Sequence, residues 1–587
     1  MRMQIWRACA LAAMLAFAGP AAAQRADDPA AASVIARDAL FYPVMAQNGM
    51  ISAEDGLAAE VGVEILRQGG NAVDAAVATG FAMAVSHPQA GNLAGGGFML
   101  IALAKTGKVV AIDYREMAPA AATRDMYIGA DGEVDNARSR YSRAAAGVPG
   151  TVAGLIHALE TYGTMSLAQV LEPAIRLAEN GIAVPWGLAY ALEQNRRRFE
   201  KDPSSIAYFF RPDGQAYAAG ETLKQPDLAK TLRAIAGDGT RGFYEGWVAD
   251  KIVAEMEAGG GLITREDLKS YRVAEREPVR GEYRGAEIYS MPPPSSGGVH
   301  LVEMLNILEG YDLKAAGLNS ADYIGLMVEA MRRAYADRAT HMGDPDFWKV
   351  PVAGLTSKSY AAKLRAGIDP AKASKSADIS AGTPPAAEGP QTTHFSVMDK
   401  DGNTVSNTTT LNFTFGSGYS VDGAGFLLNN EMDDFAAKPG APNAFGLTGG
   451  DANAIAPGKR PLSSMTPTIV MKDGRAFLAT GSPGGSTIIT VVLQVLLNVL
   501  EFDMNIAEAT AWPRVHHQWM PDNVITERGI SPDTLRLLEA RGFILPKGPD
   551  GKIVHRVLGR ANSVMRARAM LFGASDPRAA DGAVASY

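Results

Sequence analysis

The chain has 587 residues, of which 47% are hydrophobic, so it is long enough and apolar enough to bury a large core. Its 56 basic and 63 acidic side chains give a formal charge of −7, spread along the chain without basic blocks, which excludes nucleic acid as an expected partner. With 62 glycines and 33 prolines, the composition is that of a loop-rich protein containing both helices and strands.

The N-terminus has the pattern of an export signal. Arg2 and Arg7 flank the start of a short apolar run, and a stretch of small residues follows it and ends at Ala23. About ten apolar residues are too few to span a membrane, which needs about 20. We expect residues 1–23 to be removed, leaving a periplasmic or secreted protein without a stable membrane anchor. The only cysteine, Cys9, would leave with them, so disulfides and a cysteine nucleophile are not expected.

Hydrophobic spacing predicts helices and strands in an order typical of a layered fold. Helical spacing is found at 56–68, 71–86, 151–160, 166–179, 227–236, 248–257, 300–308 and 321–338. Strand-like alternation is found at 98–103, 109–114 and 280–291. The helices between 150 and 271 predict a helical layer or lobe. Residues 369–390 then carry few large apolar side chains, which predicts a segment unable to order itself.

A β-hairpin is predicted directly after this polar segment. Two β-prone runs, 392–398 and 404–412, flank an Asp401-Gly402 turn. Centring the hairpin on that turn sets Thr392 opposite Thr410, within one residue of register. The spacing alone therefore places one hydroxyl beside another.

A strand at 475–480, a glycine-rich turn at 481–486 and an apolar helix at 487–500 follow later in the chain. No lysine follows the last glycine, so a nucleotide-binding loop is not indicated. Such a turn can still direct free backbone N–H groups at a developing negative charge, as an oxyanion hole does. The alternative is a tight strand-to-helix connection in which the glycines only permit close packing.

Two common hydrolase classes are excluded by motif. None of the eight histidines forms a His-Glu-x-x-His pattern, and no Gly-x-Ser-x-Gly elbow is present. A zinc peptidase or an ordinary serine hydrolase is therefore not indicated, and no metal or organic cofactor is implied.

Seven motifs, in this order, resemble those of the γ-glutamyltransferases. They are GGNAVDA at 69–75, DYREMAP at 113–119, QTTHFSV at 391–397, TLN at 410–412, LLNNEMDDF at 427–435, KRPLSSM at 459–465 and GSPGGS at 481–486. The resemblance covers nearly all of the chain beyond the signal segment.

The resemblance implies an α+β fold, the four-layer αββα sandwich of the N-terminal nucleophile hydrolases, with a helical lobe from the large subunit. It also implies a precursor that cleaves itself between Gln391 and Thr392. The products would be a large subunit, 24–391, ending in a flexible tail at 369–391, and a small catalytic subunit, 392–587, which stay together as a heterodimer.

Cleavage would create the catalyst. A threonine hydroxyl is too weakly acidic to attack an amide unaided, but a free α-amine, with a pKa of about 7.7–8.0, can take its proton. The resemblance assigns Thr392 as this nucleophile, Thr410 as its hydrogen-bonding neighbour, and the backbone amides of Gly484 and Gly485 as the oxyanion hole.

Recognition of a γ-glutamyl group requires a cation for its α-carboxylate and acceptors for its α-ammonium. The residues that the resemblance implies are Arg115, Ser463 and Ser464 for the carboxylate, and Asn412, Glu431 and Asp434 for the ammonium. Without the resemblance, Arg115 would be interpreted as a surface ion-pair residue, and the two acids as solvated loop charges.

The resemblance further implies a lid loop, 439–450, over the pocket. Phe445 in this loop stands where many bacterial members have tyrosine, so this chain lacks the hydroxyl that would hydrogen-bond Asn412.

The predicted function is γ-glutamyl transfer from glutathione and other γ-glutamyl compounds, through an acyl-enzyme on Thr392, to water or to amino acids and peptides. Two alternatives remain: a related acylase acting on glutaryl side chains of cephalosporins, and a binding protein that kept the fold without catalysis. Glutaryl substrates lack the α-ammonium, so the acids at 431 and 434 favour the γ-glutamyl reading.

Overall fold

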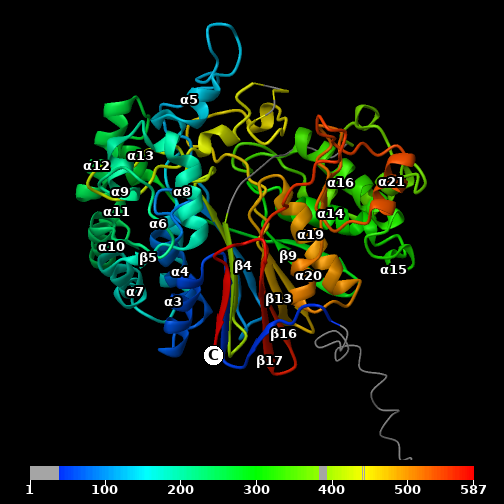
Figure 1. Cartoon of the computed structure of the whole chain (residues 1–587), viewed down its shortest axis with the longest axis horizontal. Coiled ribbons are helices and arrows are strands. Elements are labelled where there is room, and N and C mark those ends of the chain that lie inside the picture. The colour runs from blue at the N-terminus through cyan, green and yellow to red at the C-terminus, as the bar shows by residue number, and fades with distance from the viewer. Residues whose placement is uncertain (1–38, 383–392, 439, 442) are drawn as a thin grey trace, which may run out of the picture.

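The computed structural model describes residues 39–382, 393–438, 440–441 and 443–587. Two seven-stranded antiparallel sheets lie face to face at the centre, and helices cover the outer face of each (Figure 1). This is the four-layer αββα sandwich that the sequence predicted, so the fold class is confirmed. Among the described residues, no helix combines the length and apolar character needed to cross a membrane.

The first sheet carries the predicted hairpin at its centre. Its strands, in spatial order, are β18 (Ala583–Ser586), β2 (Gly49–Ala53), β10 (Thr393–Asp399), β11 (Thr404–Thr410), β3 (Gly96–Ala102), β4 (Val109–Tyr114) and β7 (Ala274–Arg276). Strands from both sides of the predicted cleavage site therefore pair within one sheet.

The second sheet mixes the two parts of the chain in the same way. Its strands, in spatial order, are β1 (Val44–Ala46), β17 (Met570–Ser575), β16 (Asn562–Ala567), β13 (Arg475–Gly481), β12 (Thr468–Lys472), β9 (Ala286–Ser290) and β8 (Val279–Tyr283). Two small ribbons lie outside the sandwich: β5 (Ile182–Ala183) with β6 (Thr222–Leu223), and β14 (Val515–His516) with β15 (Ile525–Thr526).

The helices outside the first sheet come from the earlier part of the chain and form the predicted helical lobe, on the left in Figure 1. They are α3 (Gly56–Arg67), α4 (Ala72–Ser86), α5 (Asn136–Arg140), α6 (Thr151–Tyr162), α7 (Leu167–Asn180), α8 (Trp186–Phe199), α9 (Pro203–Phe209), α10 (Pro226–Asp238), α11 (Arg241–Tyr244), α12 (Gly246–Gly259) and α13 (Arg265–Ser270). Every residue of α4 is buried, and the Asn71 side chain accepts hydrogen bonds from the N–H groups of the first turn.

The helices outside the second sheet come from both parts of the chain. They are α14 (Gly297–Leu308), α15 (Leu313–Ala316), α16 (Ala321–His341), α17 (Val352–Leu355), α18 (Lys358–Ala366), α19 (Thr487–Leu500), α20 (Ile506–Ala511) and α21 (Pro532–Ala540). Short 3₁₀ turns occupy Arg143–Ala145, Ser376–Asp378, Glu431–Asp434 and Asp451–Asn453.

Apolar side chains fill three layers of contact. One cluster lies between the first sheet and its helices, one between the second sheet and its helices, and one between the two sheets. In the hairpin, Phe395 and Val397 belong to the helix-side cluster, whereas Met398 belongs to the cluster between the sheets. Side chains therefore alternate between the two faces of this sheet, as strand geometry requires.

Two predicted segments differ in detail. Residues 280–291 form two strands, β8 and β9, because Arg284 and Gly285 adopt φ of 50° and 80° and turn the chain between them. Part of the segment 369–390, which was expected to lack order, packs against the later part of the chain. Ser376 is buried, and its N–H donates to Asp522. The Trp519 indole donates to the carbonyls of Ser376 and Ile379. Residues 383–391 of that segment lie outside the described residues.

Candidate active site

The hairpin has the register that the sequence predicted. Thr393 pairs with Thr409 and His394 with Thr408, and the same register continues along both strands. Thr410 is buried, and its Oγ1 accepts a hydrogen bond of 2.7 Å from the Asn412 N–H. Gln391 and Thr392, the predicted cleavage site and nucleophile, lie outside the described residues.

The face of the hairpin toward the second sheet is polar at this end. The His394 ring contacts Thr408 Oγ1 at 2.9 Å and Ser396 Oγ at 3.0 Å, and Ser396 donates to the carbonyl of Asn562 on β16. Burial lowers the pKa of His394 to about 3, so the ring is neutral near pH 7. A buried, uncharged, hydroxyl-rich surface therefore adjoins the start of β10.

The glycine-rich turn connects β13 to α19 as predicted. Gly484 and Gly485 adopt φ of 135° and 64°, a region that favours glycine. A Cβ on Gly484 would lie 2.4 Å from Thr487 Oγ1, so close packing also requires glycine there. Within the described part of the chain, neither amide nitrogen donates to a partner. Both N–H groups are thus available to a negatively charged oxygen.

Arg115 follows β4 and is entirely buried, which contradicts its interpretation as a surface ion-pair residue. Its guanidinium donates to Glu431 Oε1, to Asp434 Oδ2 at 2.5 Å and to the Pro461 carbonyl at 3.0 Å. Glu116 Oε2 lies 3.6 Å from Nη1. Burial alone would lower the pKa of Arg115, but the three carboxyl groups outweigh it and raise that pKa.

Two acidic side chains of this cluster, and the amide of Asn412, have oxygens that accept no hydrogen bond. Glu431 Oε2, Asp434 Oδ1 and Asn412 Oδ1 are buried and have no hydrogen-bond partner among the described residues. Burial raises the pKa of Glu431, and it raises the pKa values of Glu116 and Asp434 well above their usual range. Three carboxyl groups surround a single guanidinium, and some of their oxygens have no hydrogen-bond partner. A ligand that brings a positive charge and N–H donors would therefore suit this cluster.

The predicted serine pair lies beside this cluster and is fully buried. Ser464 Oγ accepts a hydrogen bond of 2.8 Å from Arg338 on α16, and Ser463 Oγ accepts one of 3.1 Å from the Met465 N–H. Because both oxygens accept these bonds, their hydroxyl hydrogens are left to donate to a carboxylate.

Sequence reasoning missed two charged neighbours of the site. Glu116 directly follows Arg115 in the DYREMAP motif, and this adjacency was the available signal. Arg338 lies 126 positions from the Ser464 that it contacts, so no local pattern indicates the pairing.

The lid segment makes an aromatic contact. The Phe445 ring meets Phe413 edge to face, with centroids 5.5 Å apart and an interplanar angle of 88°. The Asn412 side-chain amide donates to the Asn430 carbonyl at 2.9 Å. The Phe445 ring therefore packs on the residue next to Asn412. Residues 439 and 442 of this loop lie outside the described residues.

A cavity of about 430 Å³ opens at the meeting point of these parts. Its lining includes Thr410, Asn412 and Gly484, which lie far apart in sequence. No cluster of histidine, cysteine or acidic side chains suited to a metal ion is found in the part of the chain that the structure describes.

Comparison with known proteins decides the family. The family model described as gamma-glutamyltranspeptidase matches residues 58–586. The glutathione hydrolase proenzyme of Escherichia coli (strain K12) is 50% identical over 582 residues, which cover 99% of each chain. The chain belongs to the gamma-glutamyltranspeptidase family. It is accordingly an enzyme of the γ-glutamyl transferase and hydrolase class, made as a self-processing precursor.

Solved structures of gamma-glutamyltranspeptidase relatives share this fold. Cephalosporin acylase from Bacillus halodurans superposes with a TM-score of 0.82 at 29% identity, covering 94% of this chain and 97% of that one. A chain of Helicobacter pylori gamma-glutamyltranspeptidase superposes with a TM-score of 0.55 at 50% identity, covering 56% of this chain and 93% of that one. A protein titled cephalosporin acylase thus has the same scaffold as this chain.

Proposed function

We propose that this enzyme cleaves glutathione and related γ-glutamyl compounds and passes the γ-glutamyl group to water or to an amino acid or peptide. The observation that carries the proposal is the buried cluster of Arg115, Glu431 and Asp434, whose unpaired acceptor oxygens are joined by that of Asn412, which is bonded to the carbonyl of the residue before Glu431. An α-ammonium would fill those acceptors, and an α-carboxylate would bind the guanidinium and the Ser463 and Ser464 hydroxyls.

The proposed maturation step uses the hairpin. If the register of β10 and β11 continued one position beyond Thr393, Thr392 would pair with Thr410 and, by the alternation of side chains, would share a face with His394. The Thr392 hydroxyl attacks the Gln391 carbonyl, and the C–N bond breaks as an ester forms. Water then hydrolyses the ester, releasing the Gln391 carboxylate and restoring the Thr392 hydroxyl beside a new α-amine.

The proposed turnover repeats this chemistry on the substrate. The α-amine takes the Thr392 hydroxyl proton as the oxygen attacks the γ-carbonyl, and the amides of Gly484 and Gly485 stabilise the developing oxyanion. The proton passes to the departing amine, which leaves an ester on Thr392. A neutral acceptor amine or water attacks this ester, forms the new C–N or C–O bond, and returns a proton to the threonine oxygen.

The same proposal covers the export of the enzyme and the association of its two subunits. Residues 1–23 would direct export and be removed, so the enzyme acts in the periplasm or outside the cell. The large and small subunits would remain one heterodimer, because each sheet contains strands from both. Separating them would break each sheet wherever a strand of one subunit pairs with a strand of the other, and would leave unpaired strand edges.

The competing substrate class is a glutaryl amide, which has the carboxylate but lacks the α-ammonium. It would leave the unpaired oxygens of Glu431, Asp434 and Asn412 buried without a hydrogen-bond donor, which is unfavourable. The test compares a γ-glutamyl anilide with the matching glutaryl anilide on the processed enzyme. The proposal requires a large preference for the γ-glutamyl compound; equal turnover of both would refute it.

A further inference from the structure

Another cavity, of about 440 Å³, lies at the end of the hairpin opposite the candidate active site. Turns of both sheets form it: 102–104 and 400–402 from the first sheet, and 474–476 from the second. Strand β10 runs from Thr393 to Asp399, which is about 20 Å at about 3.4 Å per residue. The cavity is therefore separate from the site that Thr410 borders.

The charged side chains that line this cavity are mostly cationic. They are Lys400, Arg475 and Arg566, against the single acid Asp401. Asp401 is engaged by its own neighbour, because Lys400 Nζ lies 2.8 Å from Asp401 Oδ2 and 2.9 Å from Oδ1. No acid of the lining is thus left to balance the two arginines.

Arg566 lies against the turn between β10 and β11. Its Nη2 donates to the carbonyl of Asp399 at 2.7 Å. A Cβ on Gly402 would lie 3.3 Å from Nη1, so glycine lets the guanidinium approach the turn closely. Nε is buried without an acceptor, and no acceptor for Nη1 is found among the described residues. A neutral oxygen therefore fixes this guanidinium in place, and its charge has no ion pair.

The carboxylate of Asp399, although close to Arg566, is occupied by the turn. Its oxygens accept hydrogen bonds from the N–H groups of Ala72 and residues 401–403 and from the side-chain amide at 403. Burial lowers the pKa of Arg566, and while the Asp399 charge raises that pKa, the charge of Arg475 lowers it again. The two guanidinium groups are therefore close enough to repel each other.

Arg475 is the first residue of β13 and is exposed. Within the described part of the chain, no hydrogen bond or ion pair is found for its side chain. Its cross-strand partner is Lys472, so two like charges lie directly opposite each other, which is unfavourable. The Lys472 ammonium lies 4.0 Å from the centroid of the Phe477 ring. The Arg475 guanidinium is left free to bind two oxygens of one anion.

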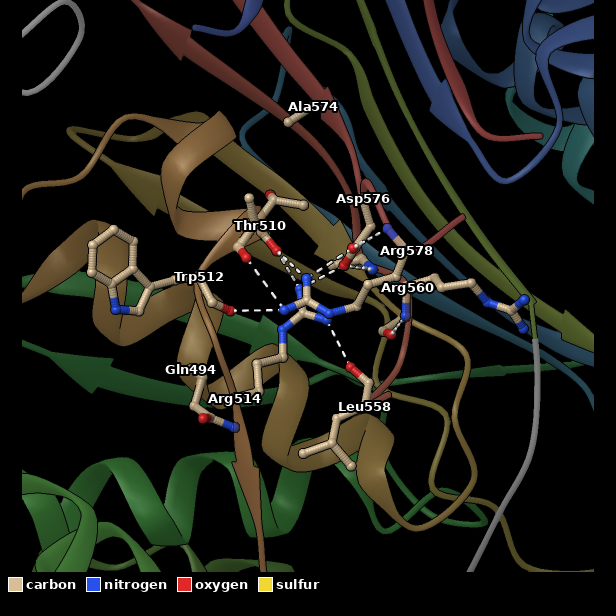
Figure 2. A network of polar contacts seen from close by, with 12 residues as sticks. Gln494, Thr510, Trp512, Arg514, Leu558, Arg560, Ala574, Asp576 and Arg578 are labelled. Atoms are coloured by element: carbon tan, nitrogen blue, oxygen red, sulfur yellow. Dashed lines mark hydrogen bonds and ion pairs between the residues drawn. The ribbon is translucent and has the colours of Figure 1, made fainter. Parts of the chain in front are cut away.

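Two other arginine clusters in this protein are balanced by acids. Arg514 and Arg578 both donate to Asp576, and Figure 2 shows the two guanidinium groups packed around that carboxylate. Arg115 has Glu431 and its neighbouring acids in the same way. The pair of Arg475 and Arg566 has no such acid among the described residues. Its counter-ion is therefore expected to come from outside the chain.

We propose that this cavity is an anion-binding site for a phosphate group, held by the paired donors of Arg475 and by Nη1 of Arg566. A phosphate group has enough oxygens for both guanidinium groups, and near pH 7 a monoester carries a charge of about −1.5 to −2, which matches their two positive charges. Inorganic phosphate and a small organic phosphate monoester carry the same group. The site does not depend on the proposed function, because none of its residues belongs to the candidate active site.

Calorimetric titration of the processed enzyme with inorganic phosphate, and separately with glycerol 1-phosphate, tests the proposal at an ionic strength held constant with sodium chloride. The wild type should bind one phosphate group per enzyme. Arg475→Gln and Arg566→Gln should each weaken binding at least about tenfold, because each removes charge-assisted hydrogen bonds. Tighter binding of glycerol 1-phosphate would assign the site to an organic monoester, and equal or weaker binding would assign it to the free ion.

Arg536→Gln is the matched control. It removes one positive charge from an exposed arginine of α21 that is not part of the lining, so it should bind phosphate as the wild type does. A tenfold loss in this variant as well would mean that only net charge attracts the anion, which would overturn the site.

Thermal unfolding gives a second measurement, because a ligand that binds only the folded protein raises Tm. Phosphate should raise the Tm of the wild type and leave that of Arg475→Gln unchanged. In phosphate-free buffer, Arg475→Gln should have a Tm equal to or above that of the wild type, because it relieves the repulsion by Lys472 and Arg566. A lower Tm there, or equal phosphate binding by the wild type and Arg475→Gln, would overturn the proposal, as would a wild type that binds neither phosphate compound.

Discussion

Arg115 and Glu431 form an ion pair in which neither side chain is exposed, although 316 positions separate them. The pair joins the two parts of the chain that the predicted cleavage would separate. Asp434 binds the same guanidinium, and Glu116 lies beside it. These side chains therefore stabilise each other in the protein as well as being candidates to bind the two charged groups of a substrate.

This double role defines the first prediction, for Arg115→Gln. Removing the guanidinium leaves three buried carboxyl groups without a cation, which should lower the free energy of unfolding by about 3–5 kcal/mol. The KM for a γ-glutamyl anilide should also rise. Arg124→Gln is the control, because that side chain is 33% exposed and its pair with Asp451 should contribute about 0–1 kcal/mol.

Denaturant titration and KM measurement on the two variants check this prediction. A stability of Arg115→Gln within about 1 kcal/mol of the wild type would mean that the cluster does not depend on this cation. An unchanged KM would remove Arg115 from substrate binding.

The hairpin and the Arg115 cluster show which features the sequence alone predicts and which it does not. The hairpin register was predictable because an Asp-Gly turn and a period of two are local properties. The helix 56–67 was predictable because apolar residues recur at helical spacing, and the helix 72–86 because a nearly all-apolar run follows the capping residue Asn71. By contrast, the convergence of Arg115 with Glu431 was accessible only through the resemblance, since neither spacing nor composition links them.

Other features had no local signal at all. The contacts of Arg338 with Ser464 and of Arg560 with Glu54 depend on how two sheets and two helical layers stack. The two-strand nature of 280–291 depended on an Arg-Gly turn, which is a weaker hairpin signal than Asp-Gly.

The second prediction concerns Thr392, the proposed nucleophile for maturation and turnover. Thr392→Ala should remain a single chain on denaturing electrophoresis and should have no γ-glutamyl hydrolase activity, because both steps use the same hydroxyl. The wild-type small subunit should begin at Thr392 by N-terminal sequencing.

The neighbouring threonine supplies the control. Thr393 is buried, and its Oγ1 has no hydrogen-bond partner among the described residues, so Thr393→Val removes an unsatisfied hydroxyl without changing shape. This variant should mature into two subunits with stability equal to or above that of the wild type. Two subunits from Thr392→Ala would show that another residue performs the cleavage.

The third prediction concerns the pH dependence of stability. Glu303 is fully buried on α14, where burial and then the neighbouring Asp337 raise its pKa well above the usual range. His300, 2.7 Å from Glu303, has a pKa lowered by burial and by Arg338 and His341, so it supplies no compensating charge. The folded protein therefore holds the Glu303 proton more tightly than the unfolded chain does.

The sign of the effect follows from this difference. The stability that Glu303 contributes is fully present below its unfolded pKa of about 4.3 and is lost as the pH rises through its folded pKa. Glu303→Gln should make the slope of unfolding free energy against pH less negative in this range, by up to about 1.4 kcal/mol per pH unit. The surface variant Glu64→Gln is the control, and equal slopes in wild type and Glu303→Gln would contradict the prediction.

The last prediction concerns Phe445 in the lid. Its ring meets Phe413 edge to face and also packs against the apolar cluster between the second sheet and its helices, and an edge-to-face pair contributes about 0.5–1.5 kcal/mol. If this contact holds the lid over Asn412, Phe445→Ala should raise the KM for a γ-glutamyl anilide by roughly 2- to 13-fold with little change in maturation. Phe445→Tyr keeps the ring contact and adds the hydroxyl, so its KM should equal or fall below that of the wild type. Steady-state kinetics of the two variants decide the matter: a raised KM for Phe445→Tyr, or an unchanged one for Phe445→Ala, would show that lid closure does not depend on this aromatic contact.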